Sequence, residues 1–204
     1  MASASPRRSE LLGAIGLSFE VRPADIDEEA VGAGLAPAAA VLAVAEAKAD
    51  AAQHDDALVL TADTVVVLDG VVLGKPSSTG DARRMLGLLR GRAHRVLTAL
   101  CLSAPDAARR SEVVESEVRM RAYSDGEVAA YLATGAGLDK AGAYGIQDEL
   151  LRPVESITGC WCNVMGLPLW TAWRMLAEAG IRPPRMPDAA FPRCGPCPLG
   201  SASR

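Results

Sequence analysis

The sequence contains few of the residues on which several familiar functions depend. Of its 204 residues two are histidine, eight are aromatic, and only three of the 21 basic side chains are lysine. No apolar run approaches the roughly 20 residues that cross a bilayer, and the N-terminal residues are polar rather than signal-like. The net charge of −4 argues against broad attraction to nucleic acid or to an anionic membrane. We therefore expect a soluble, cytoplasmic protein that needs a local cluster of cations to hold any anionic ligand.

The cysteines are five in number and stand at positions 101, 160, 162, 194 and 197. Their spacing matches neither a secreted disulfide framework nor a four-ligand zinc site, so reduced thiols are expected. Cys194 and Cys197 have the separation of a thioredoxin-type redox pair. They lie in a segment rich in proline, glycine and serine, which we predict to be a disordered tail over residues 187–204. The pair is therefore expected to be inert, and residues 1–186 are predicted to form a single domain.

Capping and alternation signals divide this domain into helices and strands. Asp69-Gly70 stands between two apolar runs, which is a strong signal for a hairpin turn. Ser124 and Glu127 have capping-box spacing, which predicts the start of a helix. The acidic stretch 25–29 has no clear period and is predicted to be a loop. Predicted helices cover 6–15, 37–52, 78–89, 124–134 and 167–179, and predicted strands cover 57–60, 64–68, 94–102, 112–122 and 154–157.

The N-terminal segment is the first candidate for an anion site. Residues 3–8, Ser-Ala-Ser-Pro-Arg-Arg, place two hydroxyl and two guanidinium groups at the start of a predicted helix. Unpaired backbone N–H groups and the helix dipole favour an anion at that position. A capped surface helix with solvated arginines explains the same residues equally well.

Asp63 is the strongest candidate for a catalytic residue. It interrupts an otherwise apolar strand, where a carboxylate is costly to bury unless it is paired, hydrogen-bonded or bound to a metal. The alternative is an aspartate that faces solvent at a β-bulge. Glu28 could supply a second carboxylate to Mg²⁺, which prefers one or two carboxylates with water and substrate phosphates, although acidic loops are usually only solvated.

Further candidates lie on two loops and one strand. Lys75, between Gly74 and Pro76, suits phosphate binding but could equally be a solvated edge lysine. The glycine-rich stretch 139–147 could recognise a nucleobase, or Lys140 could pair with Asp139 while Tyr144 packs in the core. General acid/base work is conceivable for His94, but a structural role is the stronger interpretation.

These motifs stand in the order found in the Maf (septum formation) family, which the sequence resembles from residue 2 to about residue 180. The resemblance rests most on the nine residues Asp-Lys-Ala-Gly-Ala-Tyr-Gly-Ile-Gln at 139–147. The other matching segments are residues 3–8, Asp-Glu at 27, Glu-Ala-Lys-Ala at 46, Ala-Asp-Thr at 62, Gly-Lys-Pro at 74, Gly-Arg-Ala-His-Arg-Val-Leu-Thr at 91 and Asn-Val-Met-Gly-Leu-Pro at 163.

The resemblance implies an elongated α/β fold with two lobes, a mixed, twisted sheet and a central cleft, similar to the inosine-triphosphatase fold. It also implies a homodimer, and cleavage of a nucleoside triphosphate to the monophosphate and pyrophosphate with Mg²⁺, or Mn²⁺ in its place. By the same resemblance Asp63 matches the proton acceptor and, with Glu28, a metal ligand. The phosphate-contacting positions are matched by Ser3, Arg8, Lys48 and Lys75.

Three further positions match those that distinguish the family's substrate classes. The branch that resembles dTTP/UTP pyrophosphatases carries arginine, threonine and glutamine there, as this chain does at Arg7, Thr64 and Gln147. The branch that acts on 7-methyl-GTP typically carries tryptophan, glutamine and glutamate. We therefore expect dTTP and UTP as substrates, with modified pyrimidine nucleotides as further candidates. A 7-methyl-GTP pyrophosphatase and a non-catalytic nucleotide-binding regulator of cell division are the alternatives.

Overall fold

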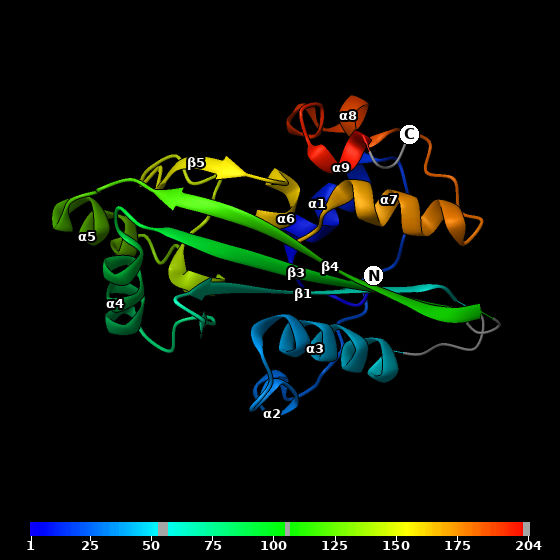
Figure 1. Ribbon diagram of the computed structural model, residues 1–204, viewed down its shortest axis with the longest axis horizontal. Coiled ribbons are helices and arrows are strands. Elements are labelled where there is room, and N and C mark those ends of the chain that lie inside the picture. Colours follow the sequence, from blue (N-terminus) through cyan, green and yellow to red (C-terminus); the bar gives the residue numbers. More distant parts are fainter. Residues whose placement is uncertain (53–56, 105–106, 202–204) are drawn as a thin grey trace.

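The computed structural model describes residues 1–52, 57–104 and 107–201. Its architecture is α/β, as predicted: a long sheet runs through an elongated molecule and helices lie on both faces (Figure 1). The strand order is β2-β1-β3-β4-β5, and every pairing is antiparallel. The prediction of a mixed sheet is therefore wrong for the described strands, because each strand pairs with a neighbour that runs back along it. None of the helices in these residue ranges has the length and apolar character to cross a membrane.

β1 (Val59–Leu68) is one continuous strand where the sequence predicts two runs separated at Asp63. Its ladder with β3 (Ala93–Ala104) continues through the carboxylate, which lies opposite Ala99, while Thr64 lies opposite Thr98. Asp63 thus sits inside a regular strand, not at a bulge. The predicted hairpin is confirmed: Asp69 and Gly70 both adopt positive φ and lead into β2 (Val71–Leu73).

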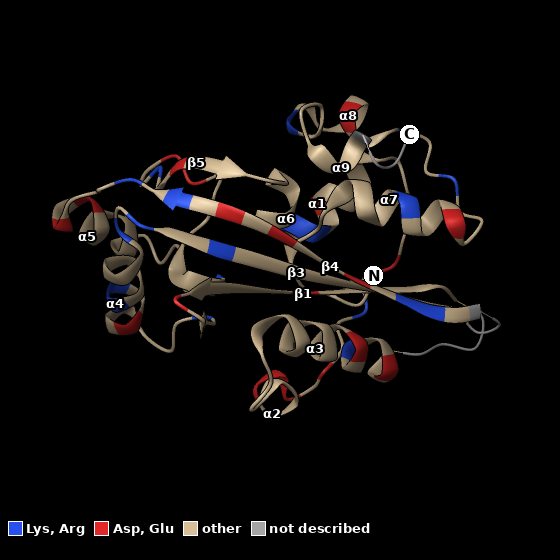
Figure 2. Cartoon of the chain, in the orientation of Figure 1, with Lys and Arg blue, Asp and Glu red and all other residues tan. Residues whose placement is uncertain are grey.

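β3 and β4 (Ala107–Met120) form the antiparallel pair that the sequence predicts, but they extend further toward their connection. The early part of β4 is polar and carries Arg109 and Arg110, which hides its strand character in the sequence. Ion pairs with Asp50 and Glu178 anchor these two side chains. β5 (Val154–Thr158) completes the sheet. Figure 2 shows acidic and basic residues interspersed over the helices and strands.

α3 (Pro37–Ala51) covers one face of the sheet against β1 and β3 (Figure 1). The buried hydroxyl of Thr61 donates to the Ala45 carbonyl at 2.6 Å and ties strand to helix. The acidic stretch, predicted to be a loop, starts the short helix α2 (Glu28–Gly32). Asp27 caps this helix by accepting a hydrogen bond from the Ala30 N–H at 3.0 Å. The cap stabilises the start of the helix although the segment has no apolar period by which to predict it.

The opposite face carries α1 (Pro6–Ala14), α6 (Trp161–Val164) and α7 (Leu169–Glu178) around one apolar cluster. α4 (Thr79–Leu89) and α5 (Asp125–Ala133) pack near the far end of the sheet with the short turn η1 (Ala141–Ala143). Ser124 and Glu127 form the predicted capping box. α6 is absent from the predicted elements, because four residues are too few to show a helical period.

The segment after Met186 is ordered from 187 to 201, which corrects the prediction of a disordered tail; residues 202–204 lie outside the described ranges. It forms α8 (Pro187–Ala190), η2 (Pro192–Cys194) and α9 (Pro198–Ser201). Trp170 of α7 donates its indole N–H to the Cys194 carbonyl at 3.0 Å. The composition suggests disorder, but the segment packs on the apolar surface of α7, and such tertiary contacts are invisible in composition.

Candidate active site

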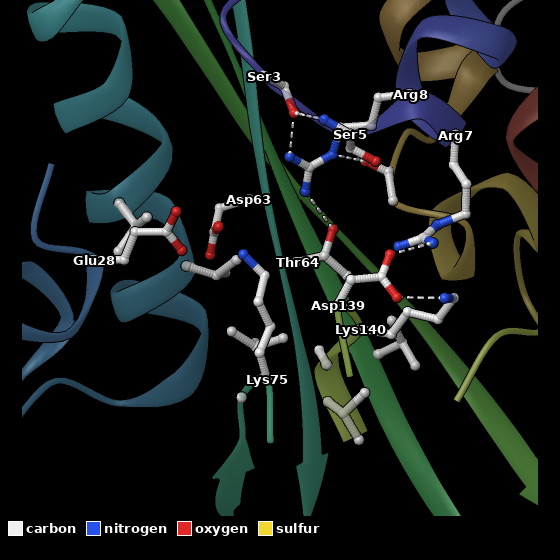
Figure 3. A pocket seen from close by; sticks show the side chains of 18 of the residues that line it. Ser3, Ser5, Arg7, Arg8, Glu28, Asp63, Thr64, Lys75, Asp139 and Lys140 are labelled. Atoms are coloured by element: carbon white, nitrogen blue, oxygen red, sulfur yellow. Dashed lines mark hydrogen bonds and ion pairs between the residues drawn. The ribbon is translucent and has the colours of Figure 1, made fainter. Parts of the chain in front are cut away.

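A cavity of about 1000 Å³ lies where the N-terminal segment, α2, α3, β1, β2, the loop after α5 and the residues after α6 meet. This volume is at the upper end of typical small-molecule sites. The cavity wall contains eight of the nine predicted site residues. They are Ser3, Arg7, Arg8, Glu28, Lys48, Asp63, Thr64 and Lys75 (most of them labelled in Figure 3).

Two carboxylates in the cavity converge on one ammonium group. Lys48 Nζ lies 2.8 Å from Asp63 Oδ1 and 2.9 Å from Glu28 Oε1. Lys48 and Asp63 are buried, whereas the Glu28 side chain is half exposed. Partial burial alone would raise the pKa of Glu28, but the hydrogen bond and charge of Lys48, with the charges of Lys75 and Arg8, together lower it. Both carboxylates are thus held beside a cation in a single place.

This convergence provides a test of whether the residues suit a divalent ion. Glu28 and Asp63 already approach one cationic atom within hydrogen-bond distance, so a metal could be held by the same two carboxylates. Hard oxygen ligands of this kind suit Mg²⁺, which takes its remaining ligands from water and substrate phosphates. Within the described ranges, no group of three or more His, Cys, Asp or Glu side chains is arranged to hold a metal. The residues therefore fit an ion that needs few protein ligands.

Arg8 is more deeply engaged with the protein than its predicted phosphate-binding role suggests. Its guanidinium donates to the Gly166 carbonyl at 2.8 Å, to Ser3 Oγ and the Ala62 carbonyl at 2.9 Å, and to Thr64 Oγ1 at 3.1 Å. Since a guanidinium has five N–H groups, these four bonds leave one for a ligand. Arg8 thus fixes the cavity wall by joining α1, β1 and the turn after α6.

A chain of hydroxyl groups continues from Arg8 into the sheet. Thr98 donates to the Asn163 carbonyl at 2.9 Å, so its single hydroxyl hydrogen is committed. Thr64 Oγ1, 3.0 Å from Thr98 Oγ1, must then be the donor in that pair while it accepts from Arg8. The orientation of the Thr64 hydroxyl at the cavity is therefore set by two other residues.

The other cations of the cavity differ in how far they are paired. Arg7 lies 3.4 Å from the Asp139 carboxylate, which also pairs with Lys140. This confirms the predicted alternative for Lys140. Lys75 is exposed and forms no ion pair with a residue that the structure describes. Its side chain reaches toward Asp63 and Glu28 (Figure 3), which leaves its ammonium group available to an anion.

Gln147 is the predicted site residue that does not line this cavity. It is exposed and lies on a second hollow, with Trp161 and Arg193. His94 is buried, and its Nε2 lies 2.7 Å from the hydroxyl of Tyr144, itself buried in the wall of the main cavity. Burial lowers the pKa of His94 to about 4. A neutral, buried imidazole against a core tyrosine agrees with a structural role.

Sequence reasoning missed Thr98, Asn163 and Gly166. Thr98 lies opposite Thr64 in the β1 to β3 ladder, but β2 and α4 intervene in the chain, so no tight turn fixes that register in advance. Gly166 adopts a φ of +103°, and a Cβ there would lie 3.3 Å from both Arg8 Nε and Thr64 Oγ1. That close approach explains why the turn carries a glycine. The segment 163–168, which is part of the family resemblance, was the signal in the sequence that could have pointed to Asn163 and Gly166.

The fold and the cavity define an α/β protein whose cleft combines paired carboxylates with several cations, as a phosphorylated ligand and a divalent ion require. Residues 1–179 match the family model described as Maf-like protein, and the chain belongs to the Maf family. A dTTP/UTP pyrophosphatase of Thermomicrobium roseum is 48% identical over 206 aligned positions, covering 99% of this chain and 94% of that protein. The proteins of that name from Syntrophomonas wolfei and Anaeromyxobacter dehalogenans are 45% and 48% identical, covering 88% and 89% of this chain and 96% and 93% of theirs.

Proposed function

We propose that this protein is a cytoplasmic pyrophosphatase that hydrolyses dTTP and UTP to the monophosphate and pyrophosphate. The observation that carries the proposal is the convergence of Asp63 and Glu28 on one cation in a cavity lined by further cations. The names of the relatives support the choice of nucleotides. Binding alone would not need two carboxylates beside the phosphate groups, because they repel an anion unless a cation lies between them.

In the proposed reaction Asp63 accepts a proton from water, whose oxygen attacks the α-phosphorus. The bond from the α-phosphorus to the oxygen that bridges to the β-phosphate breaks, and pyrophosphate leaves with the bonding electrons. Lys48 engages Oδ1 of Asp63, so the second carboxylate oxygen is the one that would accept this proton. A divalent ion, Mg²⁺ first and Mn²⁺ second, would be held by Glu28 and Asp63 and would neutralise charge on the phosphate oxygens.

The proposed phosphate-binding groups are of two kinds: Lys75 is exposed and unpaired among the described residues, whereas Arg8 and Ser3 are held in place by hydrogen bonds. Lys75 is exposed and can follow the charge that develops on the leaving pyrophosphate. Arg8 contributes its one remaining N–H from a fixed position, and Ser3, whose hydroxyl accepts from Arg8 at 2.9 Å, can donate its own proton to a phosphate oxygen. We therefore assign the orientation of the triphosphate to Arg8 and Ser3, and the stabilisation of charge on the leaving pyrophosphate to Lys75.

Arg7 and Thr64 lie in the cavity and are the residues proposed to favour a pyrimidine nucleotide. Gln147 lies outside it and would act on specificity through the 139–147 loop, whose earlier residues line the cavity. The 7-methyl-GTP alternative is disfavoured, because this chain has Arg7, Thr64 and Gln147 where that branch typically has tryptophan, glutamine and glutamate.

The test is release of pyrophosphate from dTTP, UTP, CTP, 7-methyl-GTP and ITP with Mg²⁺. Wild type is compared with Asp63→Asn and with Asp69→Asn. Asp69 is the matched control, since it lies on the same hairpin, forms an exposed ion pair with Arg92 and has a φ of 51° that asparagine tolerates. We expect turnover of dTTP and UTP in wild type and Asp69→Asn, and loss of at least 100-fold in Asp63→Asn. Nucleotide binding without turnover in wild type would support the non-catalytic regulator instead.

A further inference from the structure

Four of the five cysteines meet on the side of the molecule that carries α6 and the C-terminal segment. Cys160 and Cys162 flank Trp161 at the start of α6, while Cys194 ends η2 and Cys197 follows three residues later. All four are buried, with Cys197 the most exposed at 7%. The two pairs are separated by 31 residues of chain, which is why their spacing in the sequence does not resemble a single site.

The four sulfur atoms form one continuous group. Cys162 Sγ lies 3.2 Å from Cys194 Sγ. The Cys160 side chain lies within interaction range of the thiols of Cys162 and Cys197. Cys101, the fifth cysteine, packs elsewhere, between β3 and α3. Two thiols from each of two distant segments thus gather in one place.

We propose that these four cysteines bind one Zn²⁺ as a structural site that fastens the C-terminal segment to α6. Tetrahedral coordination by four thiolates at about 2.3 Å places the sulfur atoms about 3.8 Å apart. The Cys162 and Cys194 sulfurs are closer than this, and as the side chains stand no three ligands among the described residues surround a metal position. Coordination therefore requires these thiols to separate by about half an ångström, which small side-chain rotations provide.

A backbone donor also points at the cluster. The Asn163 N–H donates to Cys160 Sγ at 3.4 Å, a contact that would stabilise a metal-bound thiolate. Four thiols that bind Zn²⁺ release four protons to solvent and leave a unit with a charge of −2. The Arg193 guanidinium, 4.2 Å from the centre of the Trp161 ring, lies beside the cluster and offsets that charge.

The metal also has a route of entry. Cys197 lines the second hollow, of about 780 Å³, together with Trp161 and Arg193. A zinc ion would meet Cys197 first from this hollow, since the other three cysteines lie deeper. The site is separate from the carboxylates of the main cavity, none of which lines the second hollow.

Zinc at this place would stabilise the residues after α6 that form part of the cavity wall. Two backbone carbonyls within four residues of Cys162 accept hydrogen bonds that support the cavity wall. The Asn163 carbonyl accepts from Thr98 and the Gly166 carbonyl accepts from Arg8. Fastening α6 to the C-terminal segment would fix the position of both carbonyl groups. The ion would be a structural element that does not touch the nucleotide.

The experiment measures zinc per chain by mass spectrometry of the purified, gel-filtered protein, and the absorption spectrum after replacement by Co²⁺. We expect one zinc per chain and the intense visible bands of a tetrahedral Co²⁺ thiolate centre. Cys162→Ser and Cys197→Ser should weaken zinc binding by roughly 100-fold or more, whereas Cys101→Ser and Asp63→Asn should retain it. Cys197→Ser is included because it changes the least buried ligand and is the variant best able to fold.

Metal-free protein that takes up neither ion would overturn the proposal, and so would Co²⁺ spectra without thiolate bands. A mass lower by two hydrogens, from a Cys162 to Cys194 disulfide in protein purified under reducing conditions, would overturn it as well. None of these measurements depends on nucleotide hydrolysis, so they stand apart from the test of the proposed function.

Discussion

The ammonium nitrogen of Lys48 lies 2.8 Å from Oδ1 of Asp63, and only about a tenth of either side chain is exposed. The same nitrogen lies 2.9 Å from Glu28. Two like charges can share this small region because a cation stands between them. Lys48 thus holds the two carboxylates close together through its charge and hydrogen bonds, which is a different contribution from direct contact with phosphate.

Replacing Lys48 by methionine should leave Asp63 buried without its partner. Loss of one member of a buried ion pair costs about 3 kcal/mol or more in free energy of unfolding, and urea denaturation would measure it. Lys140→Met is the matched control: its partner Asp139 is mostly exposed, so the cost should stay below about 1 kcal/mol. Adding Asp63→Asn to Lys48→Met should restore part of the loss. Equal losses in the two methionine variants would contradict the assigned role of Lys48.

Replacing Lys75 by alanine should weaken catalysis without affecting stability. The side chain is exposed and forms no ion pair with a described residue, so urea denaturation should be unchanged. Removal of one charge-assisted hydrogen bond to phosphate should lower kcat/KM for dTTP roughly tenfold or more. Steady-state kinetics would measure this change, with Arg84→Ala, an exposed residue of α4, as the control. A kcat/KM equal to that of wild type would exclude Lys75 from the phosphate site.

The depressed pKa of His94 predicts a loss of stability in mild acid. Burial lowers its pKa from 6.5 to about 4 in the folded protein, so the unfolded chain binds a proton first as the pH falls. The stabilisation is present above pH 6.5 and is lost between about 6.5 and 4, with a magnitude of roughly 3 kcal/mol.

His94→Asn should remove this contribution, and urea denaturation at several pH values would show a flatter pH dependence for the variant. The carboxyl groups titrate in both proteins, so the difference between the two curves isolates the imidazole. Parallel curves would show that His94 is protonated in the folded state as readily as in the unfolded state.

Gly137 and Gly135 offer a test of close packing behind the 139–147 loop. Both adopt positive φ, +90° and +75°, so alanine is strained at each by about 1 kcal/mol. A Cβ at Gly137 would lie 2.4 Å from the Ala143 carbonyl oxygen, whereas nothing lies within 4 Å at Gly135. Gly137→Ala should therefore cost at least about 2 kcal/mol more in unfolding free energy. If the two alanine variants unfold at the same urea concentration, the loop does not pack as described.

Local patterns in the sequence were sufficient for most of the regular elements. Capping residues, the Asp69-Gly70 turn and apolar runs depend on neighbours a few positions away, so α1, α3, α4, α5 and the hairpin could be recognised directly. The ordered segment after Met186 and helix α6 could not be recognised in this way. Both are held by contacts with α7 and the sheet, as the bond from Trp170 to Cys194 illustrates, and those contacts join positions far apart in the chain.

The residues of the candidate site could largely be predicted from the sequence, but the contacts that decide the role of each residue could not. Asp63 stood out because a carboxylate in an apolar strand needs a partner, and the structure supplies that partner as Lys48. That Arg8 donates four N–H groups to the protein could not be predicted, since its acceptors are backbone carbonyls and hydroxyls far away in the chain. Side-chain type indicated charge, but only the fold determines whether that charge faces a ligand.

The bond between Arg8 and the Gly166 carbonyl joins positions 158 residues apart, and the cavity draws its walls from segments spread between Ala2 and Gly166. A fragment that lacks either end of this range cannot assemble the cavity, so a ligand of the cavity binds the folded state. At 100 times its dissociation constant such a ligand adds about 2.7 kcal/mol to global stability. Protection from heat or proteolysis by a non-hydrolysable analogue of each nucleotide in the panel would thus report affinity independently of turnover.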